Sequence, residues 1–182
     1  ALTLIVFTKV RKQSFFSMAD SGVLGLITGQ IIGRWGNFFN CEAFGGFTDN
    51  LLAMRIKMSL VNPSMISQEL VDKQIVENGV AYIQVHPTFF YESMWNLGVL
   101  AFMLWYRKRK KFEGEMLWIY FLGYGLGRVW IEGLRTDQLK LPGTGMAVSQ
   151  LLSAALVCVA AAVIVTRHRK LKAEKENMRT EP

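Results

Sequence analysis

Long apolar runs alternate with short polar connections along most of the chain. The clearest run, residues 146–166, has 21 residues without a charged side chain and is followed at once by the basic sequence RHRK. An α-helix of that length extends for about 30 Å, which is enough to cross the hydrocarbon core of a bilayer. The run therefore predicts a transmembrane helix.

Three further runs, residues 21–40, 89–106 and 116–134, predict spans although each carries a few polar or charged side chains. The apolar residues before Lys9 are too few to cross a bilayer. We interpret them as the end of a helix whose beginning is absent, and we expect the sequence to be the C-terminal portion of a longer protein. The predicted fold class is all-α: a polytopic integral membrane protein with four transmembrane helices and a truncated N-terminal one, in which residues 1–182 form a single transmembrane domain.

The composition favours a membrane protein over a soluble domain. Hydrophobic residues make up 51% of the chain, which has 5 Trp and 12 Phe, and the mean hydropathy is +0.23. Two cysteines are too few for a disulfide framework, and two distant histidines offer no metal-ligand spacing. We expect no metal site and no nucleic-acid partner, because no phosphate-binding glycine loop or basic-aromatic motif is present either.

Basic residues orient the predicted spans. The sequence RKRKK at 107–111, the basic residues before position 13 and the tail 167–182 are predicted to be cytoplasmic, because Lys and Arg concentrate in cytoplasmic loops. Residues 45–88 hold three basic and four acidic side chains and predict an extracytoplasmic insertion, and the connection 135–145 fits the same side. The net charge of +7 is then explained by cytoplasmic flanks that contact anionic lipid.

Arg34 and Arg128 are the only basic residues inside the predicted spans. With Glu92 and Glu132 they fall toward the outer ends of three helices. A charged side chain near the centre of a membrane helix costs about 2.5–3.5 kcal/mol, so these groups are expected to face one another or a polar chamber open to the outer leaflet. The alternative is purely structural pairing: Arg128 with Glu132, and Arg34 with either Glu42 or Glu92.

Helical spacing groups these polar residues on shared faces. Arg34 and Asn37 are three residues apart, whereas Tyr124, Arg128 and Glu132 are spaced by four. Two guanidinium groups at the depth of lipid headgroups suit a phosphate, because they bind its oxygens in pairs and stay charged when desolvated. The other features have simpler explanations: His86 as a loop residue, Cys41 as a packing residue, and the glycines of GYGLGR as sites of close helix packing.

Three sequence blocks together resemble the prolipoprotein diacylglyceryl transferase family. GRWGNFFNCEAFGG at 33–46 closely resembles the family signature Gly-Arg-x-Gly-Asn-Phe-x-Asn-x-Glu. HPTFFYE at 86–92 is similar to its His-Pro-x-x-x-Tyr-Glu block, and GYGLGRVWIEGLRTD at 123–137 to its Tyr-Gly-x-x-Arg-x-x-x-Glu-x-x-Arg-x-Asp block. The resemblance extends over nearly the whole chain except the 45–85 loop and the basic tail.

The resemblance implies a bacterial inner-membrane enzyme that transfers diacylglyceryl from phosphatidylglycerol to the lipobox cysteine of a prolipoprotein signal peptide, with its active site toward the outer leaflet. It also implies that no cofactor or metal is required, because the phospholipid is already an activated donor. The implied catalytic residues are Arg128, Glu132, Tyr124 and Glu42, and the implied substrate-binding residues are Arg34, Asn37, Asn40, Glu92, His86 and Arg135. Family members carry an essential histidine in an upstream His-Gly-Gly motif, so we expect these 182 residues alone to be inactive. A noncatalytic membrane lipid-binding scaffold and a transporter subunit are the alternatives.

Overall fold

The computed structural model describes residues 2–136, 138–139 and 147–180. Met146, where the fourth predicted span begins, and part of the 135–145 connection lie outside these ranges. The α-helices are α1 (Leu2–Arg11), α2 (Phe15–Phe39), α3 (Gln68–Asp72), α4 (Thr88–Tyr106), α5 (Glu115–Ile131) and α6 (Val148–Thr180). The strands are β1 (Met54–Lys57), β2 (Ile75–Glu77) and β3 (Val80–Val85). The short 3-10 helices are η1 (Met58–Leu60), η2 (Pro63–Met65), η3 (Arg107–Arg109) and η4 (Glu132–Leu134).

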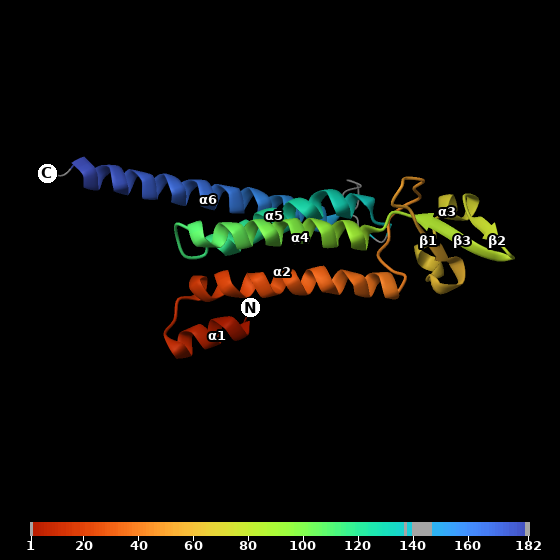
Figure 1. Cartoon of the computed structure of the whole chain (residues 1–182), viewed down its shortest axis with the longest axis horizontal. Helices are drawn as coiled ribbons and strands as arrows, with labels where there is room; N and C mark the ends of the chain where they lie inside the picture. The colour runs from red at the N-terminus through yellow and green to blue at the C-terminus, as the bar shows by residue number, and fades with distance from the viewer. Residues whose placement is uncertain (1, 137, 140–146, 181–182) are drawn as a thin grey trace.

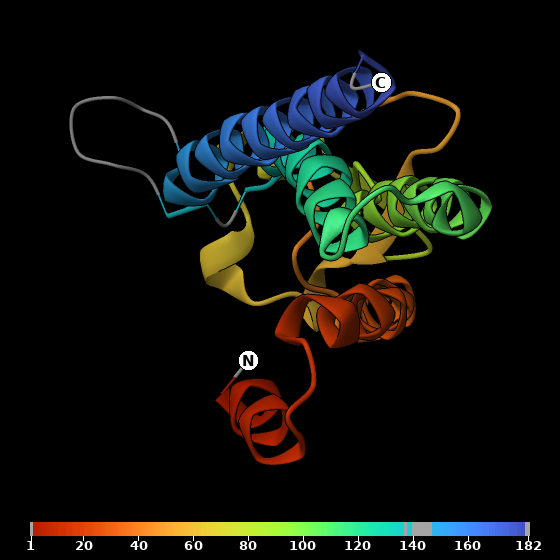
Figure 2. The ribbon, with the colours of Figure 1, turned by 90° about the vertical axis from the view of Figure 1, so that its left-hand side faces the viewer.

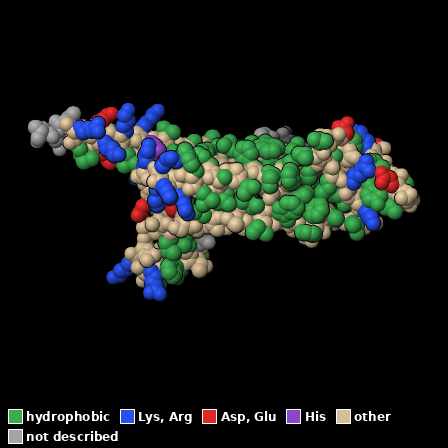
Figure 3. Space-filling model, viewed as in Figure 1, with side chains coloured by type: hydrophobic (Ala, Val, Ile, Leu, Met, Phe, Trp, Pro, Cys, Tyr) green, Lys and Arg blue, Asp and Glu red, His purple; other side chains and the backbone are tan. Residues whose placement is uncertain are grey.

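The four long helices form an elongated bundle, with the strands at one end and the C-terminus beyond the other (Figure 1). The view turned by 90° shows α5 between α4 and α6 (Figure 2). Helix α2 packs against α4 and α5 on the side away from α6. Lys and Arg gather at the end from which α6 projects, whereas hydrophobic side chains dominate the visible middle (Figure 3). This distribution is typical of a membrane-embedded helical bundle.

Two of the four helices predicted to span the membrane are long and apolar enough for a span by length and composition, α2 and α6. Helix α5 has only 17 residues, and α4 has 19 that include Glu92 and Asn96. The chain is mostly helical, but the count of four spans stays a prediction. Helix α2 begins at Phe15 and not at residue 21, because Ser14 caps it by accepting a hydrogen bond from the Ser17 amide.

The glycines of GYGLGR allow close helix packing, as predicted. A Cβ on Gly123 would lie 2.7 Å from Val99 of α4, and one on Gly125 would lie 2.8 Å from Val157 of α6. A Cβ on Gly127 would lie 2.3 Å from the ring of Trp95. These alternate glycines let α5 approach α4 on one face and α6 on the other.

The insertion between α2 and α4 corrects the all-α prediction. It contains a three-stranded antiparallel sheet in the order β1-β3-β2, with Met54 opposite Val85 and Ile75 opposite Tyr82. The sheet has its own apolar core, made of Phe44, Ile56, Val61, Leu70, Ile83 and Val85. The helical core is separate and consists of Val23, Ile27, Met103, Met116, Ile119 and Tyr120.

Two buried carboxylates lie at the basic end of the bundle, where the sequence reasoning assigned no buried charge. Asp20 of α2 accepts hydrogen bonds from the amides of Gly114 (2.9 Å) and Leu117 (3.1 Å), so it caps α5 from another helix. Glu115 accepts a hydrogen bond from the Tyr106 hydroxyl at 2.7 Å and lies 2.6 Å from His168 of α6. Both residues fall one position outside the predicted spans, which is why they were counted as loop residues.

Candidate functional site

Five of the predicted site residues form one chain of alternating charges at the sheet end of the bundle. Arg34 of α2, Glu92 of α4, Arg128 of α5 and Glu132 of η4 lie in that order, and Arg135 follows. Their side chains are between 4% and 19% exposed, so the pairs are largely removed from solvent. Buried charges are tolerated when each is paired, which this arrangement achieves.

Glu92 is shared by two arginines. Its Oε2 lies 2.7 Å from Arg34 Nε, and its Oε1 lies 3.3 Å from Arg128 Nη1. The carboxylate itself is 4% exposed. The structure therefore selects Glu92 as the partner of Arg34 from the two alternatives left open by the sequence, Glu42 and Glu92.

Glu132 is the second carboxylate in this chain of charges. It forms an ion pair with Arg128 one helical turn before it, as the four-residue spacing predicted. The Ser149 hydroxyl of α6 donates a hydrogen bond to Glu132 Oε1 at 2.7 Å, and Arg135 Nη1 lies 3.9 Å from Oε2. Glu132 thus joins α5, α6 and the segment after η4.

A polar contact between α2 and α4 fixes the helices next to the Arg34–Glu92 pair. The Ser93 hydroxyl donates to the backbone carbonyl of Ile31 at 3.1 Å and accepts from Trp35 Nε1 at 3.3 Å. Ser93 is fully buried. Because Ser93 and Trp35 are the direct neighbours of Glu92 and Arg34 in the sequence, this contact holds the two charged side chains in register.

Little open space remains around the paired charges. The pocket that Glu92, Asn96, Tyr124 and Arg128 help to line is too small to hold a water-sized sphere. The sequence left two arrangements open, direct contact between the charges or a polar chamber, and the described residues show direct contact. Tyr124 lies beside Arg128 in this pocket and stacks on Tyr120, with ring centroids 5.6 Å apart.

A layer of uncharged polar side chains lies next to the charges and was missed by the sequence reasoning. Gln30 of α2 donates a hydrogen bond to the Tyr120 hydroxyl at 2.9 Å. Asn96, which is 2% exposed, lies one turn from Glu92, and its amide nitrogen has no hydrogen-bond partner among the described residues. The four-residue spacing of Gln30 from Arg34 and of Asn96 from Glu92 was the available signal.

The predicted residues of the turn after α2 lie apart from this chain of charges. The Asn40 side chain donates to Glu42 Oε1 at 3.2 Å, and the Glu42 amide donates to the Asn37 carbonyl at 3.0 Å. Asn40 and Glu42 are exposed, and Asn37 is half-buried. Cys41 and Ala43 have φ values of 52° and 55°, in the left-handed region that non-glycine residues rarely adopt. The turn is therefore tightly constrained where the first sequence block ends.

Gly45 brings the three sequence blocks together. Its amide donates to the His86 carbonyl at 3.0 Å, and the next amide, of Gly46, donates to the Leu134 carbonyl at 3.1 Å. A Cβ on Gly45 would lie 2.7 Å from His86 Cβ and 2.8 Å from the Leu134 oxygen, so only glycine fits. The consecutive glycines Gly45 and Gly46 at the end of the first block indicate such a close approach of backbones, and they were not interpreted in this way from the sequence.

Among the described residues, His86 forms none of the ion pairs of the chain of charges and contacts Tyr91 instead. Its Nδ1 is 3.3 Å from the Tyr91 hydroxyl, and burial lowers the pKa of the imidazole below its ordinary value. A neutral imidazole here can exchange hydrogen bonds with Tyr91. In the described ranges, no group of three or more His, Cys, Asp or Glu residues is arranged to hold a metal ion.

Comparison with known proteins gives a consistent result. The family described as prolipoprotein diacylglyceryl transferase matches residues 1–166. A phosphatidylglycerol–prolipoprotein diacylglyceryl transferase from Thermosynechococcus vestitus is 42% identical over 142 residues, which are 77% of this chain and 48% of that protein. The protein of the same name from Lysinibacillus sphaericus is 36% identical over 171 residues, or 94% of this chain and 59% of the relative. The chain spans about half the length of the curated relatives it matches.

Proposed function

Because the chain belongs to the prolipoprotein diacylglyceryl transferase family, we propose that the full-length protein transfers diacylglyceryl from phosphatidylglycerol to the lipobox cysteine thiol of prolipoproteins. This reaction is the first step of bacterial lipoprotein maturation. The relatives compared above carry the name of this activity. Family membership favours it over the two alternatives, a lipid-binding scaffold and a transporter subunit.

The observation that supports this proposal is the shared carboxylate of Glu92. Arg34 and Arg128 come from different helices, yet both lie within ion-pair distance of this one small anion. Two guanidinium groups that can hold one carboxylate can also hold the oxygens of one phosphodiester. In this proposal the donor phosphate takes over both arginines when phosphatidylglycerol binds, and Glu92 keeps them close together before it arrives.

The transfer itself requires a thiolate and a stabilised leaving group. The thiolate sulfur attacks the glyceryl carbon that bears the phosphate and forms a carbon–sulfur bond. The carbon–oxygen bond breaks, and its electron pair leaves on glycerol phosphate. Negative charge then increases on the phosphate, and Arg34 and Arg128 stabilise it. The donor lipid is already activated, so the chemistry requires no cofactor.

The remaining residues are assigned supporting roles. Glu132 orients Arg128 through their ion pair, and Arg135 adds a positive charge at the exit of the site. Tyr124 contributes a hydroxyl beside Arg128. We assign Asn37, Asn40, Glu42 and His86 to the outer boundary of the site, where the headgroup of the donor and the lipobox peptide would enter.

The charge distribution supports a position in the bacterial cell membrane. Arg34 lies near the end of α2, Glu92 near the start of α4 and Arg128 near the end of α5, which are the helix ends next to the sheet and opposite the C-terminal tail (Figure 1). This position suits a site that faces the outer leaflet when the basic tail is cytoplasmic. A prolipoprotein signal peptide and the donor lipid would both reach such a site from within the membrane.

The test uses the full-length protein in detergent, phosphatidylglycerol labelled in its acyl chains and a lipobox peptide. We expect the label to appear on the peptide cysteine, with glycerol phosphate released in equal amount, and no label on a peptide with Ser at that position. A folded protein that binds the lipid but transfers no label would support the scaffold alternative instead.

A further inference from the structure

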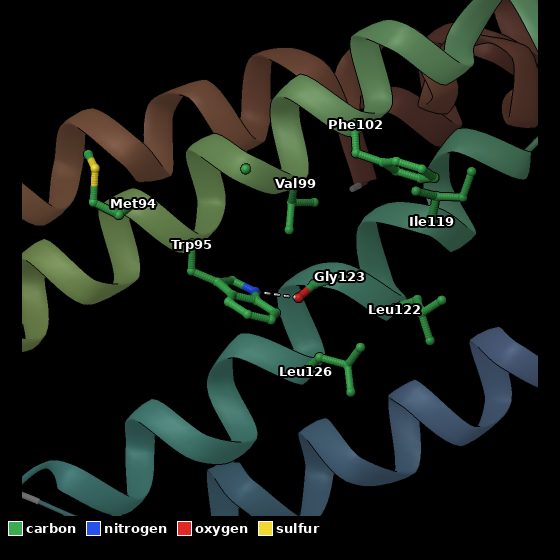
Figure 4. Close-up of a pocket in the computed structure, with 9 residues that line it drawn as sticks. Met94, Trp95, Val99, Phe102, Ile119, Leu122, Gly123 and Leu126 are labelled. Atoms are coloured by element: carbon green, nitrogen blue, oxygen red, sulfur yellow. Dashed lines mark hydrogen bonds between the residues drawn. The ribbon is translucent and has the colours of Figure 1, made fainter.

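An apolar groove runs along the seam between α4 and α5, on a part of the bundle that the proposed function does not use. Its lining residues are Met94, Trp95, Gly98, Val99, Phe102, Ile119, Leu122, Gly123 and Leu126. Figure 4 shows Trp95, Val99 and Phe102 of α4 beside Ile119, Gly123 and Leu126 of α5. Its volume is about 340 Å³, within the range of about 300–1,000 Å³ that is usual for small-ligand sites.

Trp95 forms the wall between this groove and the charged site. The same side chain lines both the groove and the small pocket that contains Glu92 and Arg128. Its ring lies across Gly127, the residue directly before Arg128, and its Nε1 donates to the Gly123 carbonyl at 2.8 Å. The groove therefore begins at the level of the charges.

The groove then leads away from the charges toward the middle of the bundle. From Trp95 to Phe102 the α4 helix rises by about 10 Å, and Ile119 of α5 lines the far end with Phe102. Half of a hydrocarbon core is about 15 Å thick. A groove of this length and direction follows the path of a lipid chain whose phosphate lies at the level of Arg128.

We propose that this groove binds one acyl chain of the phospholipid whose phosphate is held by Arg34 and Arg128. The proposal rests on the proposed function for the identity of that phospholipid. Charges at one end and an apolar lining along the rest match the two parts of a phospholipid. An α-helix, about 10–12 Å wide with its side chains, would lie over the seam and not inside it.

Gly98 offers a way to fill the groove without disturbing its walls. Within the part of the chain that the structure describes, a Cβ built on Gly98 meets no atom within 4 Å, so a phenylalanine side chain there enters open groove space. Gly25 of α2 provides the matched control, because it is exposed, its Cβ also meets nothing within 4 Å, and it lines neither the groove nor the charged site. Both substitutions add the same bulk to a membrane helix.

The experiment uses the full-length protein in detergent and phosphatidylglycerol with a photoreactive diazirine in one acyl chain. We expect crosslinks within the groove residues of α4 and α5, reduced roughly tenfold in Gly98→Phe, as for the loss of about two buried methylene groups, and unchanged in Gly25→Phe. In the transfer assay, Gly98→Phe should raise the KM for long-chain phosphatidylglycerol by a similar factor and leave the KM for the lipobox peptide unchanged.

Several results would overturn the groove assignment. Crosslinks outside α4 and α5, or equal crosslinking in both variants, would show that the acyl chain binds elsewhere or only as bulk lipid. A raised KM for the peptide alone would identify the signal peptide as the occupant. Groove crosslinks in a full-length protein without transferase activity would support the groove as an acyl-chain site and contradict the proposed function. The two failures are therefore distinguishable.

Discussion

Arg34 Nε lies 2.7 Å from Glu92 Oε2, across the contact between α2 and α4. The same carboxylate reaches Arg128, so a single buried anion forms ion pairs with two cations from different helices. A site built around one shared anion behaves differently from two independent ion pairs, because removing the anion takes the ion-pair partner from Arg34 and leaves Arg128 paired with Glu132 alone. The first three predictions below follow from this relationship.

Arg34→Lys in the full-length protein should lower kcat/KM for transfer on the order of tenfold or more, because hydrogen bonds to charged groups are strong and a lysine cannot bind a phosphate in a bidentate way. The measurement is label transfer to a lipobox peptide at equal protein abundance. Arg55→Lys is the control, since Arg55 forms an exposed pair with Glu77 in the sheet. Near-normal transfer by Arg34→Lys would exclude a bidentate role.

Glu92→Gln should reduce the free energy of unfolding by about 3 kcal/mol, as expected when one partner of a buried ion pair is removed. Inorganic phosphate should restore part of the lost thermal stability, and chloride at equal ionic strength should restore less, because phosphate can bridge the guanidinium groups of Arg34 and Arg128 in place of the lost carboxylate. The measurement is thermal unfolding in detergent, with the exposed Glu77→Gln as control. Equal effects of the two anions would argue against a shared anion site.

Replacing both Arg128 and Glu132 by Met should leave a folded protein that transfers no diacylglyceryl. Exchanging a buried pair for apolar side chains of similar volume is often neutral for stability, and the Arg34–Glu92 pair remains in place. Thermal unfolding and label transfer are measured on the same preparation. If the double variant keeps both stability and activity, these two residues have no part in the mechanism.

Gly45→Ala should destabilise the protein by about 1–3 kcal/mol, because its Cβ would clash with the Leu134 carbonyl and His86. Gly46→Ala is the matched control, as a Cβ there meets no atom of the described residues within 4 Å. Thermal unfolding distinguishes them. Equal stability of the two variants would mean that the close approach at Gly45 is not maintained in the membrane.

Membrane orientation is tested with single cysteines at Gln74 and Lys108, in a background without Cys41 and Cys158. Both positions are exposed. A cysteine at position 108 leaves intact the ion pair of the neighbouring Lys110, whose Nζ lies 3.2 Å from the buried Asp20. In intact spheroplasts an impermeant thiol reagent should label position 74 and not position 108, because the sheet insertion is predicted to be extracytoplasmic. Preferential labelling at position 108 would reverse the orientation.

The insertion shows where pattern reasoning reaches its limit. Its strands are only 3 to 6 residues long, too short for alternation to distinguish them from irregular loop segments. Their stability comes from contacts between residues far apart in the chain, such as Met54 with Val85 and Phe44 with the same core. Local sequence carries no direct record of such pairing.

The sequence by itself determined that the chain is a helical membrane protein, where its long helices lie, and that Arg34 and Arg128 are exceptional. Hydrophobicity and charge act locally, and a buried charge is costly wherever a helix places it. Only the tertiary structure decided that Arg34 pairs with Glu92 and not with Glu42, that Asp20 caps α5, and that Gly45 joins the three blocks. Those contacts depend on how each helix is rotated and shifted against its neighbours, which the periodicity within a single helix does not specify.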